Sequence, residues 1–349
     1  MSVYELIDKI SKLQSEGKDL IRLDIGQPDL PVPDAVKEAT KKAIDEDKTR
    51  YTHSKGIPEL REAVAALHGV DEKNVIITAG GKFPIYSVLQ QAVGKTTIVR
   101  PCWGAYPLIL NRFNKEFDVI DTRFEDSFAP SFESLDNASM VAINYPNNPT
   151  GVTIGKDQFK ELSDYSNDNN ATILSDEVYT KMAFTETTSI TEYDCDYICI
   201  GSFSKTFSMT GYRLGYAIAS EENIKSIQEM QQLSTTSPAD FAQHAALAAL
   251  DIIDDVSREI SDFYKKRRDE ALALLDDAGF EVVPSDGTFY LFPRIDGDSN
   301  TFAMKLLEGG VSVLPGSPFG PYDSHFRISL VTDQMEKAVR IMKETRDTL

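Results

Sequence analysis

Short apolar runs alternate along most of the chain with segments in which apolar residues recur every three or four positions. Runs of four or five apolar residues are typical of buried strands, and the longer periodic segments are typical of amphipathic helices. Strands are predicted at Val75–Thr78, Thr96–Val99, Phe117–Ile120, Met140–Ile143, Ala171–Leu174, Tyr197–Ile200 and Gly215–Ala219. Helices are predicted at Asp34–Asp47, Pro58–His68, Phe83–Val93, Lys156–Tyr165 and Glu222–Gln232. This alternation predicts an α/β fold with a mostly parallel seven-stranded sheet flanked by helices.

The pattern changes after Pro238. A helix at Ala239–Leu250 and a long charged helix at Val256–Ala278 come before several short strands and a final helix. These strands are predicted at Glu281–Val283, Phe289–Phe292, Val311–Val313 and Phe326–Leu330. At the other end, a helix around Leu6–Leu13 and an extended piece at Ile21–Ile25 precede the large unit. We expect a large domain over residues 30–254 and a smaller α+β domain built from residues 1–29 and 255–349.

Composition and charge narrow the classes of protein. The 349 residues are 41% hydrophobic and 26% charged, which is ordinary for a soluble protein of two compact units. No uncharged apolar run approaches the ~20 residues of a membrane span, and the start of the sequence lacks the features of a signal peptide. The formal net charge of −19 repels nucleic acid and anionic lipid. We expect a cytoplasmic protein with small-molecule partners and without nucleic-acid or membrane partners.

The cysteines and histidines do not predict a disulfide framework or a metal centre. The three cysteines are Cys102, Cys195 and Cys199, and an odd, sparse count fits a reducing compartment. The four histidines are scattered and form no helical metal motif. We therefore expect no metal in the site.

Some familiar motifs can be set aside. Gly94-Lys95-Thr96 resembles the end of a phosphate loop, but Leu89 stands where that loop needs glycine. Ser202-x-x-Lys205 resembles the motif of penicillin-binding enzymes, but their Lys-Thr-Gly companion is absent. The sequence has no Gly-x-Gly-x-x-Gly, so nothing supports a nicotinamide dehydrogenase.

Polar segments follow several of the predicted strands, where ligands bind in open α/β sheets. They are Gly80-Gly81-Lys82, Tyr145–Gly151, Ser175–Tyr179 and Gly201–Gly215. The glycine pair before a helix offers free backbone N–H groups to an anion, although such a pair is also common in plain turns. Tyr145–Gly151, with two prolines and two asparagines, is equally consistent with a rigid turn.

Asp176 and Lys205 indicate a catalytic site more specifically than these turn segments do. A carboxylate at a buried strand end is costly unless a cation meets it, and the structural alternative is a helix cap. A lysine that follows a buried strand among hydroxyl groups and glycines is a poor surface lysine. Desolvation favours its neutral amine, which is the form that condenses with carbonyl groups.

Taken together, the motifs resemble the class I aminotransferases of the aspartate aminotransferase fold type (fold type I) over nearly the full chain. The matching order is Gly26-Gln27-Pro28-Asp29, Tyr51-x4-Gly56-x2-Glu59-Leu60-Arg61, Gly80-Gly81-Lys82, Trp103, Asn148-Pro149-Thr150-Gly151, Asp176-x2-Tyr179, Ser202-x2-Lys205-x7-Arg213 and Arg327. Each motif is short, but seven or eight in one order are highly specific. The resemblance implies an aminotransferase that depends on pyridoxal 5′-phosphate.

It also implies roles around the cofactor ring. Lys205 would hold the cofactor as a Schiff base and carry the proton between it and the substrate Cα. Asp176 would pair with the pyridine nitrogen and keep it protonated. Tyr179 and Asn148 would hydrogen-bond the phenolic oxygen of the ring, and Trp103 would stack on its face.

The resemblance implies a phosphate site shared between subunits. Ser202, Arg213 and the N–H groups of Gly81 and Lys82 would hold the phosphate. In the family, a tyrosine of the neighbouring subunit reaches this phosphate, and Tyr51 matches it. The implied assembly is a homodimer with shared active sites.

Arg327 matches the family's arginine for the substrate α-carboxylate, with help from Asn148 and the Gly26 backbone. An arginine inside an apolar strand is costly unless it meets an anion. The Gly26 turn lies between the N-terminal helix and the large unit. We therefore hypothesise that the small domain closes over bound substrate at this turn.

The amino donor depends on a cation for the distal carboxylate. One branch of the family uses an arginine of the partner subunit, but the matching stretch here, Met230–Thr236, has no cation. A bacterial subgroup has a lysine at the position of Lys82 and uses it for acidic substrates. We predict an acidic donor such as aspartate, with 2-oxoglutarate as acceptor. Phe83-Pro84 departs from that subgroup and could widen the choice to aromatic or aliphatic donors.

Other functions remain open from the sequence. A pyridoxal-phosphate lyase, decarboxylase or cyclopropane-forming synthase on the same scaffold would share these residues. A cofactor-binding regulator without enzymatic activity would usually carry a DNA-binding domain, and this acidic chain is unsuited to DNA.

Overall fold

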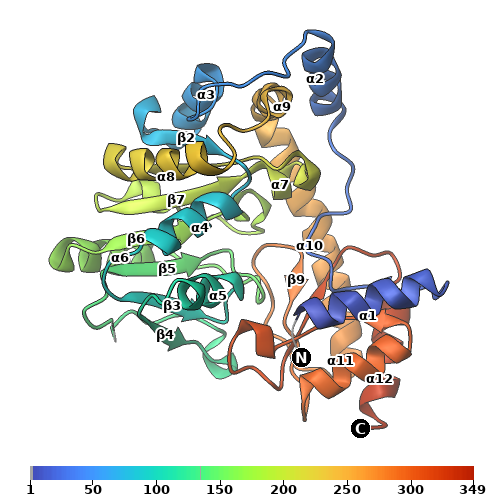
Figure 1. Cartoon of the computed structure of the whole chain (residues 1–349). Coiled ribbons are helices and arrows are strands. Elements are labelled where there is room, and N and C mark those ends of the chain that lie inside the picture. Colours follow the sequence, from blue (N-terminus) through green and yellow to red (C-terminus); the bar gives the residue numbers. More distant parts are fainter. Residues whose placement is uncertain (1–2, 134) are drawn as a thin grey trace.

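A broad sheet between two layers of helices forms the larger part of the protein, with short strands and further helices beside it (Figure 1). The structure, a computed structural model, describes residues 3–133 and 135–349. In these residues the main sheet has seven strands in the order β2-β8-β7-β6-β5-β3-β4. They are β2 (Val75–Thr78), β3 (Thr96–Arg100), β4 (Phe117–Asp121), β5 (Met140–Asn144), β6 (Thr172–Asp176), β7 (Tyr197–Ser202) and β8 (Gly215–Ala219). Within the described sheet only β8 runs against its neighbours, which confirms the mostly parallel prediction.

Both faces of this sheet are covered, because successive residues of a strand point to opposite sides. In β5, Val141 and Ile143 join one apolar core, whereas Met140 and Ala142 join another. The first core includes residues of α3 (Pro58–His68), α6 (Lys156–Asn169) and α9 (Asp240–Leu250), and α2 (Asp34–Asp45) packs on α9. The second includes residues of α4 (Lys82–Gln91), α5 (Ala105–Arg112) and α8 (Glu221–Ser234). The inner strands are therefore largely apolar and readable as short apolar runs, whereas the edge strand β4 contains two aspartates and is only partly buried.

The N-terminal segment packs with the C-terminal part of the chain. Strand β1 (Ile21–Arg22) pairs in parallel with β10 (Val311–Ser312), and β11 (Leu314–Pro315), β12 (Phe326–Ser329) and β9 (Tyr290–Leu291) form a small antiparallel sheet. The helices here are α1 (Val3–Ser15), α10 (Ile253–Asp277), α11 (Ser299–Glu308) and α12 (Met335–Arg346). Ile21 and Leu23 share a core with Val311 and Phe326. The domain limit placed after residue 254 falls inside α10, so these limits stay a prediction.

Short 3-10 helices fill several connections. They are η1 (Glu72–Asn74), η2 (Phe124–Asp126), η3 (Thr180–Met182), η4 (Ile190–Glu192), η5 (Thr210–Tyr212) and η6 (Ser317–Phe319). None of the helices in the described residues combines the length and apolar character that crossing a membrane requires.

Several predicted elements need correction. The strand expected at Glu281–Val283 is only a single bridge between Glu281 and Arg294, because Pro284 follows and cannot donate to a ladder. The strand expected at Val311–Val313 is present as β10 over Val311–Ser312, and a second short strand, β11, which was not predicted, follows Val313. Helices α5 and α11 were not predicted.

The topology brings two loops together at the carboxyl edge of the sheet. After β3 the chain moves outward to β4, and after β5 it moves the other way to β6 and β7. Such a reversal marks the usual ligand site of an open α/β sheet. Nδ2 of Asn147, in the loop after β5, donates to the carbonyl of Pro101, in the loop after β3, at 3.0 Å. These two loops carry Trp103 and Asn148.

Candidate active site

Lys205 lies on the one-turn helix α7 (Phe203–Thr206), directly after β7. The helix starts at Ser202, whose Oγ accepts a hydrogen bond from the Ser204 N–H at 3.1 Å. This cap satisfies one of the free N–H groups that every helix start leaves. The cap and the buried strand before it fix the backbone from which the lysine projects.

The amine of Lys205 is partly buried among polar and aromatic groups. Its Nζ donates to the carbonyl oxygen of Gly26 at 2.5 Å and lies 5.8 Å from the centre of the Tyr179 ring. Burial, followed by the charges of Arg327 and Arg213, lowers the pKa of Lys205 to about 8. About half of the amine is therefore neutral at pH 8, and the neutral form is the one that attacks carbonyl groups.

Asp176 ends β6 and is buried. The Tyr106 hydroxyl donates a hydrogen bond to Oδ2 of Asp176, and the Val178 N–H approaches Oδ1 at 3.4 Å. Burial raises the pKa of Asp176 to about 6, although the hydrogen bond from Tyr106 opposes this rise. Burial and the neighbouring carboxylate raise the pKa of Tyr106 well above 10, so its hydroxyl stays protonated and remains a donor. Asp176 is therefore a largely ionised, buried carboxylate at neutral pH.

A row of side chains leads from the surface to this carboxylate. Lys82 is exposed, and its Nζ lies 5.1 Å from the centre of the Trp103 ring. The half-buried Trp103 ring meets the Tyr106 ring edge to face at 5.8 Å. Tyr106 in turn bonds to Asp176. Lys82 therefore places a cation beside Trp103, the outer ring of this row, and Tyr106 lies between Trp103 and the buried carboxylate.

Arg327 is a buried cation held by neutral groups. Nη1 donates to Oδ1 of Asn148 at 3.0 Å, and Nη2 donates to the carbonyl oxygen of Asp24 at 2.8 Å. The guanidinium carbon lies 4.3 Å from the centre of the Tyr290 ring. Within the described residues, Nε of Arg327 is a buried donor without an acceptor. Such a guanidinium retains a strong preference for a carboxylate ligand.

Glycines make room for a third positive group at the start of α4. Gly80 has φ +78°, and a Cβ on it would lie 2.7 Å from Nη2 of Arg213. A Cβ on Gly215 would collide with the backbone nitrogen of Gly81. Arg213 itself has φ +54° and donates from Nη1 to the Thr210 carbonyl at 2.8 Å. A guanidinium and the first N–H groups of a helix thus come together, as in anion sites.

The sequence profile of the aminotransferases of class I and II matches residues 18–341. The chain belongs to this family. It is therefore an aminotransferase, and its cofactor is the pyridoxal 5′-phosphate on which aspartate aminotransferases and their relatives depend. The resemblance inferred from the motifs is confirmed.

Named relatives of this aminotransferase agree in fold over almost the whole chain. The aspartate aminotransferase of Thermococcus kodakarensis is 37% identical over 98% of this chain and 92% of its own length. The structure of aspartate aminotransferase from Thermus thermophilus with maleate has a TM-score of 0.93 at 30% identity, covering 99% and 96%. The structure of an aromatic aminotransferase from Pyrococcus horikoshii has a TM-score of 0.89 at 29% identity, covering 97% and 99%.

The residues of this aminotransferase fit the cofactor. A partly buried amine with a lowered pKa suits the aldehyde, and a buried ionised carboxylate suits a protonated ring nitrogen. The close packing at Gly80, Gly81 and Gly215, where a Cβ would meet Arg213 or neighbouring protein atoms, brings the backbone N–H groups before α4 near Arg213, and such a group of donors suits a phosphate. Asn148 accepts from Arg327 through its oxygen, so its amide NH2 is the group left to donate to a ligand.

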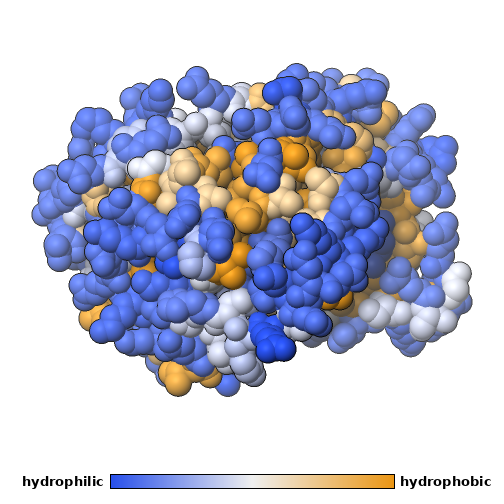
Figure 2. Space-filling view, turned by 90° about the horizontal axis from the view of Figure 1, so that it is seen from above, coloured by the Kyte–Doolittle hydropathy of each residue, from blue (hydrophilic) through white to orange (hydrophobic). Residues whose placement is uncertain are grey.

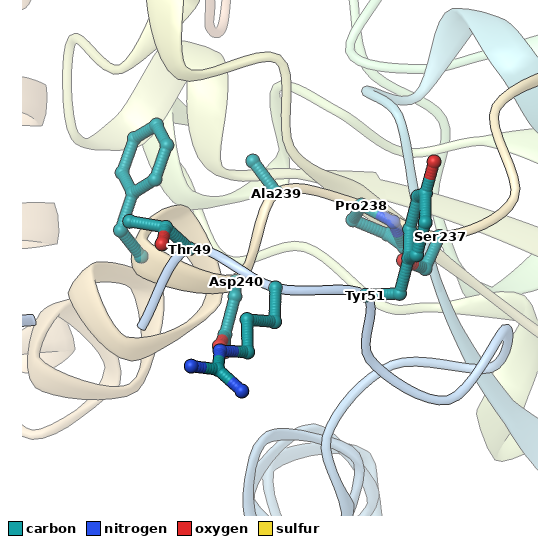
Figure 3. A pocket seen from close by; sticks show the side chains of 8 residues that line it. Thr49, Tyr51, Ser237, Pro238, Ala239 and Asp240 are labelled. Atoms are coloured by element: carbon teal, nitrogen blue, oxygen red, sulfur yellow. The ribbon is translucent and has the colours of Figure 1, made fainter. Parts of the chain in front are cut away.

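Tyr51 lies apart from the other predicted site residues, since within the described chain no hydrogen bond, ion pair or ring contact joins it to any of them. Its side chain is 85% exposed and lines a hollow of about 650 Å³ with residues of the start of α9, including Ser237, Pro238 and Asp240 (Figure 3). On this end of the molecule, apolar side chains emerge between hydrophilic ones (Figure 2). A fully exposed tyrosine gains little by itself, so its position fits a role toward a second molecule.

The sequence reasoning missed Tyr106 and Tyr290. Tyr106 was overlooked because α5 is short, yet the spacing Trp103-x-x-Tyr106 places both rings at one helix start. Tyr290 was predicted to lie on a strand but not in the site. Its hydroxyl lies 3.2 Å from the Tyr179 hydroxyl, and a Cβ on Gly26 would lie 3.0 Å from it. Both tyrosines connect groups that the motifs had identified separately.

Proposed function

We propose that this aminotransferase moves the amino group of an acidic L-amino acid, such as aspartate, to a 2-oxo acid such as 2-oxoglutarate. The observation that carries the proposal is the pair of cations around the predicted ring position. Arg327 is buried without a carboxylate partner among the described residues, and Lys82 stands beside Trp103. Two cations at the two ends of one site suit a substrate with two carboxylates.

The cofactor supplies a carbonyl that bonds to amines and a protonated ring that accepts the electron pair of a broken bond at the substrate Cα. Lys205 is the amine that would bond to this carbonyl as a Schiff base. As a free amine, Lys205 has a pKa lowered to about 8 in this site, so it would be suited to take the Cα proton and return it elsewhere. Burial, followed by the charges of Arg327 and Arg213, favours the neutral form of this amine.

Other residues would orient the cofactor. Asp176, ionised above about pH 6, would hold the proton on the ring nitrogen, and Tyr106 would orient that carboxylate. Tyr179 and the amide NH2 of Asn148 would donate to the phenolic oxygen. Trp103 would cover one ring face.

The phosphate would occupy the positive turn before α4. Ser202, Arg213 and the N–H groups of Gly81 and Lys82 would bind its oxygens. The exposed Tyr51 would reach the phosphate of a second subunit, so the proposed assembly is a homodimer. The proposed location is the cytoplasm.

Substrate binding would involve both parts of the chain. Arg327, on β12, would form paired hydrogen bonds with the α-carboxylate, with Asn148 beside it. Gly26 accepts from Lys205 and lies close to Tyr290, so the turn at Gly26 touches both the amine and the aromatic wall. We propose that the small domain closes over substrate at this turn.

An aromatic or broad donor range is the second candidate. Phe83 is half-buried and packs on the same apolar core as Trp103. A phenyl ring on that core would offer an apolar surface to an apolar substrate side chain. The donor class depends on whether Lys82 or Phe83 contributes more to the free energy of substrate binding.

Substitution of Lys82 tests the donor class. In Lys82→Ala, we expect the ratio of kcat/KM for aspartate to that for phenylalanine to fall by roughly 10- to 100-fold, since one charge-assisted contact is lost. Lys82→Arg keeps the charge and should retain most of the preference. An unchanged ratio in Lys82→Ala would remove Lys82 from substrate recognition.

The reaction type needs a separate assay. Formation of oxaloacetate from aspartate should require 2-oxoglutarate and be matched by glutamate. Release of ammonia or CO2 without an acceptor would indicate a lyase or a decarboxylase instead.

A further inference from the structure

Asp24 carries a buried carboxylate next to the proposed substrate arginine. Its side chain is 5% exposed, and its own carbonyl oxygen accepts from Nη2 of Arg327 at 2.8 Å. A buried carboxylate is normally paired with a cation, and Arg327 contacts the backbone carbonyl of the same residue. Such a pair would occupy the cation that the proposed function assigns to the substrate carboxylate.

The carboxylate is instead bound on its other side. Arg22 donates from Nε to Oδ1 and from Nη2 to Oδ2, both at 2.7 Å. The Ser312 hydroxyl also donates to Oδ1. Three donors therefore satisfy the Asp24 carboxylate, and both arms of the Arg22 fork are used.

The backbone holds this arrangement in register with Arg327. The Leu23 N–H donates to the Ser312 carbonyl at 2.9 Å, and the Ser329 N–H donates to the Leu23 carbonyl at 2.8 Å. Leu23 thus lies between β10 and β12, and Arg327 is on β12. The Asp24 carbonyl is therefore presented to Arg327 while the Asp24 side chain is presented to Arg22.

We propose that Arg22 and Asp24 are positioning residues for substrate binding: the pair fixes the Asp24 carbonyl as a neutral acceptor for Arg327 and keeps the Asp24 carboxylate from neutralising that arginine. The proposal rests on the proposed role of Arg327. The proposal predicts different effects on substrate binding for the loss of Arg22 and the loss of the Asp24 charge. Loss of Arg22 leaves a buried carboxylate beside Arg327, whereas loss of the Asp24 charge leaves Arg22, whose side chain is 25% exposed, to be hydrated.

The test compares Arg22→Gln, Asp24→Asn and the double variant as holoenzymes. L-Aspartate is titrated, and its apparent Kd is taken from the loss of the cofactor absorbance band. We expect the Kd for aspartate to rise roughly 10- to 100-fold in Arg22→Gln. The Asp24 carboxylate would then interact with Arg327 and compete with the substrate carboxylate for it. The Kd should stay within about threefold of native in Asp24→Asn and in the double variant, since both lack the competing charge.

Controls separate this effect from a general loss of structure. Arg100 and Asp121 form a fork of the same geometry, with both distances 2.7 Å and a similarly exposed arginine, so Arg100→Gln reports the loss of a fork as such. Its Kd for aspartate should stay within about threefold of native. The affinity for pyridoxal phosphate should also change less than about threefold in every variant, because the Arg22 pair does not touch the predicted phosphate turn.

The outcomes are decisive. Equal weakening in Arg22→Gln and Asp24→Asn, or no rescue in the double variant, would overturn the proposal. Should Arg22→Gln fail to fold, Asp24→Asn and the double variant still have to bind aspartate within about threefold of native, and weak binding by either refutes it. Arg327→Lys is measured in parallel: if its aspartate Kd is native, the proposed role of Arg327 fails independently of the Arg22 pair.

Discussion

The Tyr106 hydroxyl should set the pH at which the enzyme takes up its cofactor. In Tyr106→Phe, Asp176 loses a hydrogen bond that favours its ionised form. A hydrogen bond to a charged group contributes about 1.5–3 kcal/mol, and one pH unit corresponds to about 1.36 kcal/mol. The pKa of Asp176, about 6 in the native protein, should therefore rise. The midpoint of cofactor binding against pH should move up by roughly one to two pH units.

This shift sets the size of the effect at neutral pH. At pH 7 the ionised fraction of Asp176 would fall from about nine-tenths to between about a half and a tenth. Cofactor affinity should then fall roughly two- to tenfold at pH 7 and return to the native value near pH 9, because the carboxylate ionises above its pKa. A merely structural loss would weaken binding equally at every pH.

Apoenzyme is titrated with pyridoxal phosphate between pH 5.5 and pH 9 in a series of buffers of equal ionic strength, and the 15N shift of the ring nitrogen reports its protonation. Tyr322→Phe is the matched control, since its buried hydroxyl donates to the Thr122 carbonyl at 2.9 Å and, in the part of the chain that the structure describes, forms no hydrogen bond with a carboxylate. A native pH profile in Tyr106→Phe, or an equal shift in the control, would refute the reasoning.

Three further predictions address the phosphate turn, the amine and the assembly. Gly215→Ala should weaken cofactor binding at least roughly tenfold in an equilibrium titration, because its Cβ would collide with the Gly81 nitrogen. Gly211 has open space around it, so Gly211→Ala should bind the cofactor normally. Equal cofactor affinities of the two variants would contradict this prediction. The rate at which apoenzyme captures pyridoxal phosphate in stopped flow should rise with pH through about 8, where half of Lys205 is neutral, toward a plateau roughly one pH unit higher, and a flat profile would argue against the lowered pKa. Mixed subunits of Tyr51→Phe and Lys205→Ala should regain activity through one native site per dimer, and no recovery after mixing and refolding would exclude a shared site.

The main sheet could be predicted because the burial of its inner strands is visible in the sequence of each strand alone. Strands such as β5 and β7 are buried on both faces, so they read as uninterrupted apolar runs, and Lys205 and Asp176 directly follow or end such runs. Helix α3 matched its predicted bounds because Pro58 and Gly69 mark its start and end. Here the local sequence and the tertiary structure agree.

What was missed depends on partners distant in sequence. The strand β11 has two residues and exists through pairing with β12, which no local pattern reveals. The role of Asp24 depends on Ser312, which lies 288 positions away. Tyr106 became visible as a site residue only when the fold placed its hydroxyl against Asp176, 70 positions later in the chain. Motifs identify residues that touch the ligand more readily than those that hold them.

Covalent trapping tests the central claim most directly. Holoenzyme is reduced with borohydride, digested, and the labelled peptide is sequenced by mass spectrometry. We predict a single pyridoxyl group on Lys205 and none in Lys205→Ala. Label on a different lysine, or a protein that stays colourless and unlabelled after saturation with pyridoxal phosphate, would contradict the assignment of the active site.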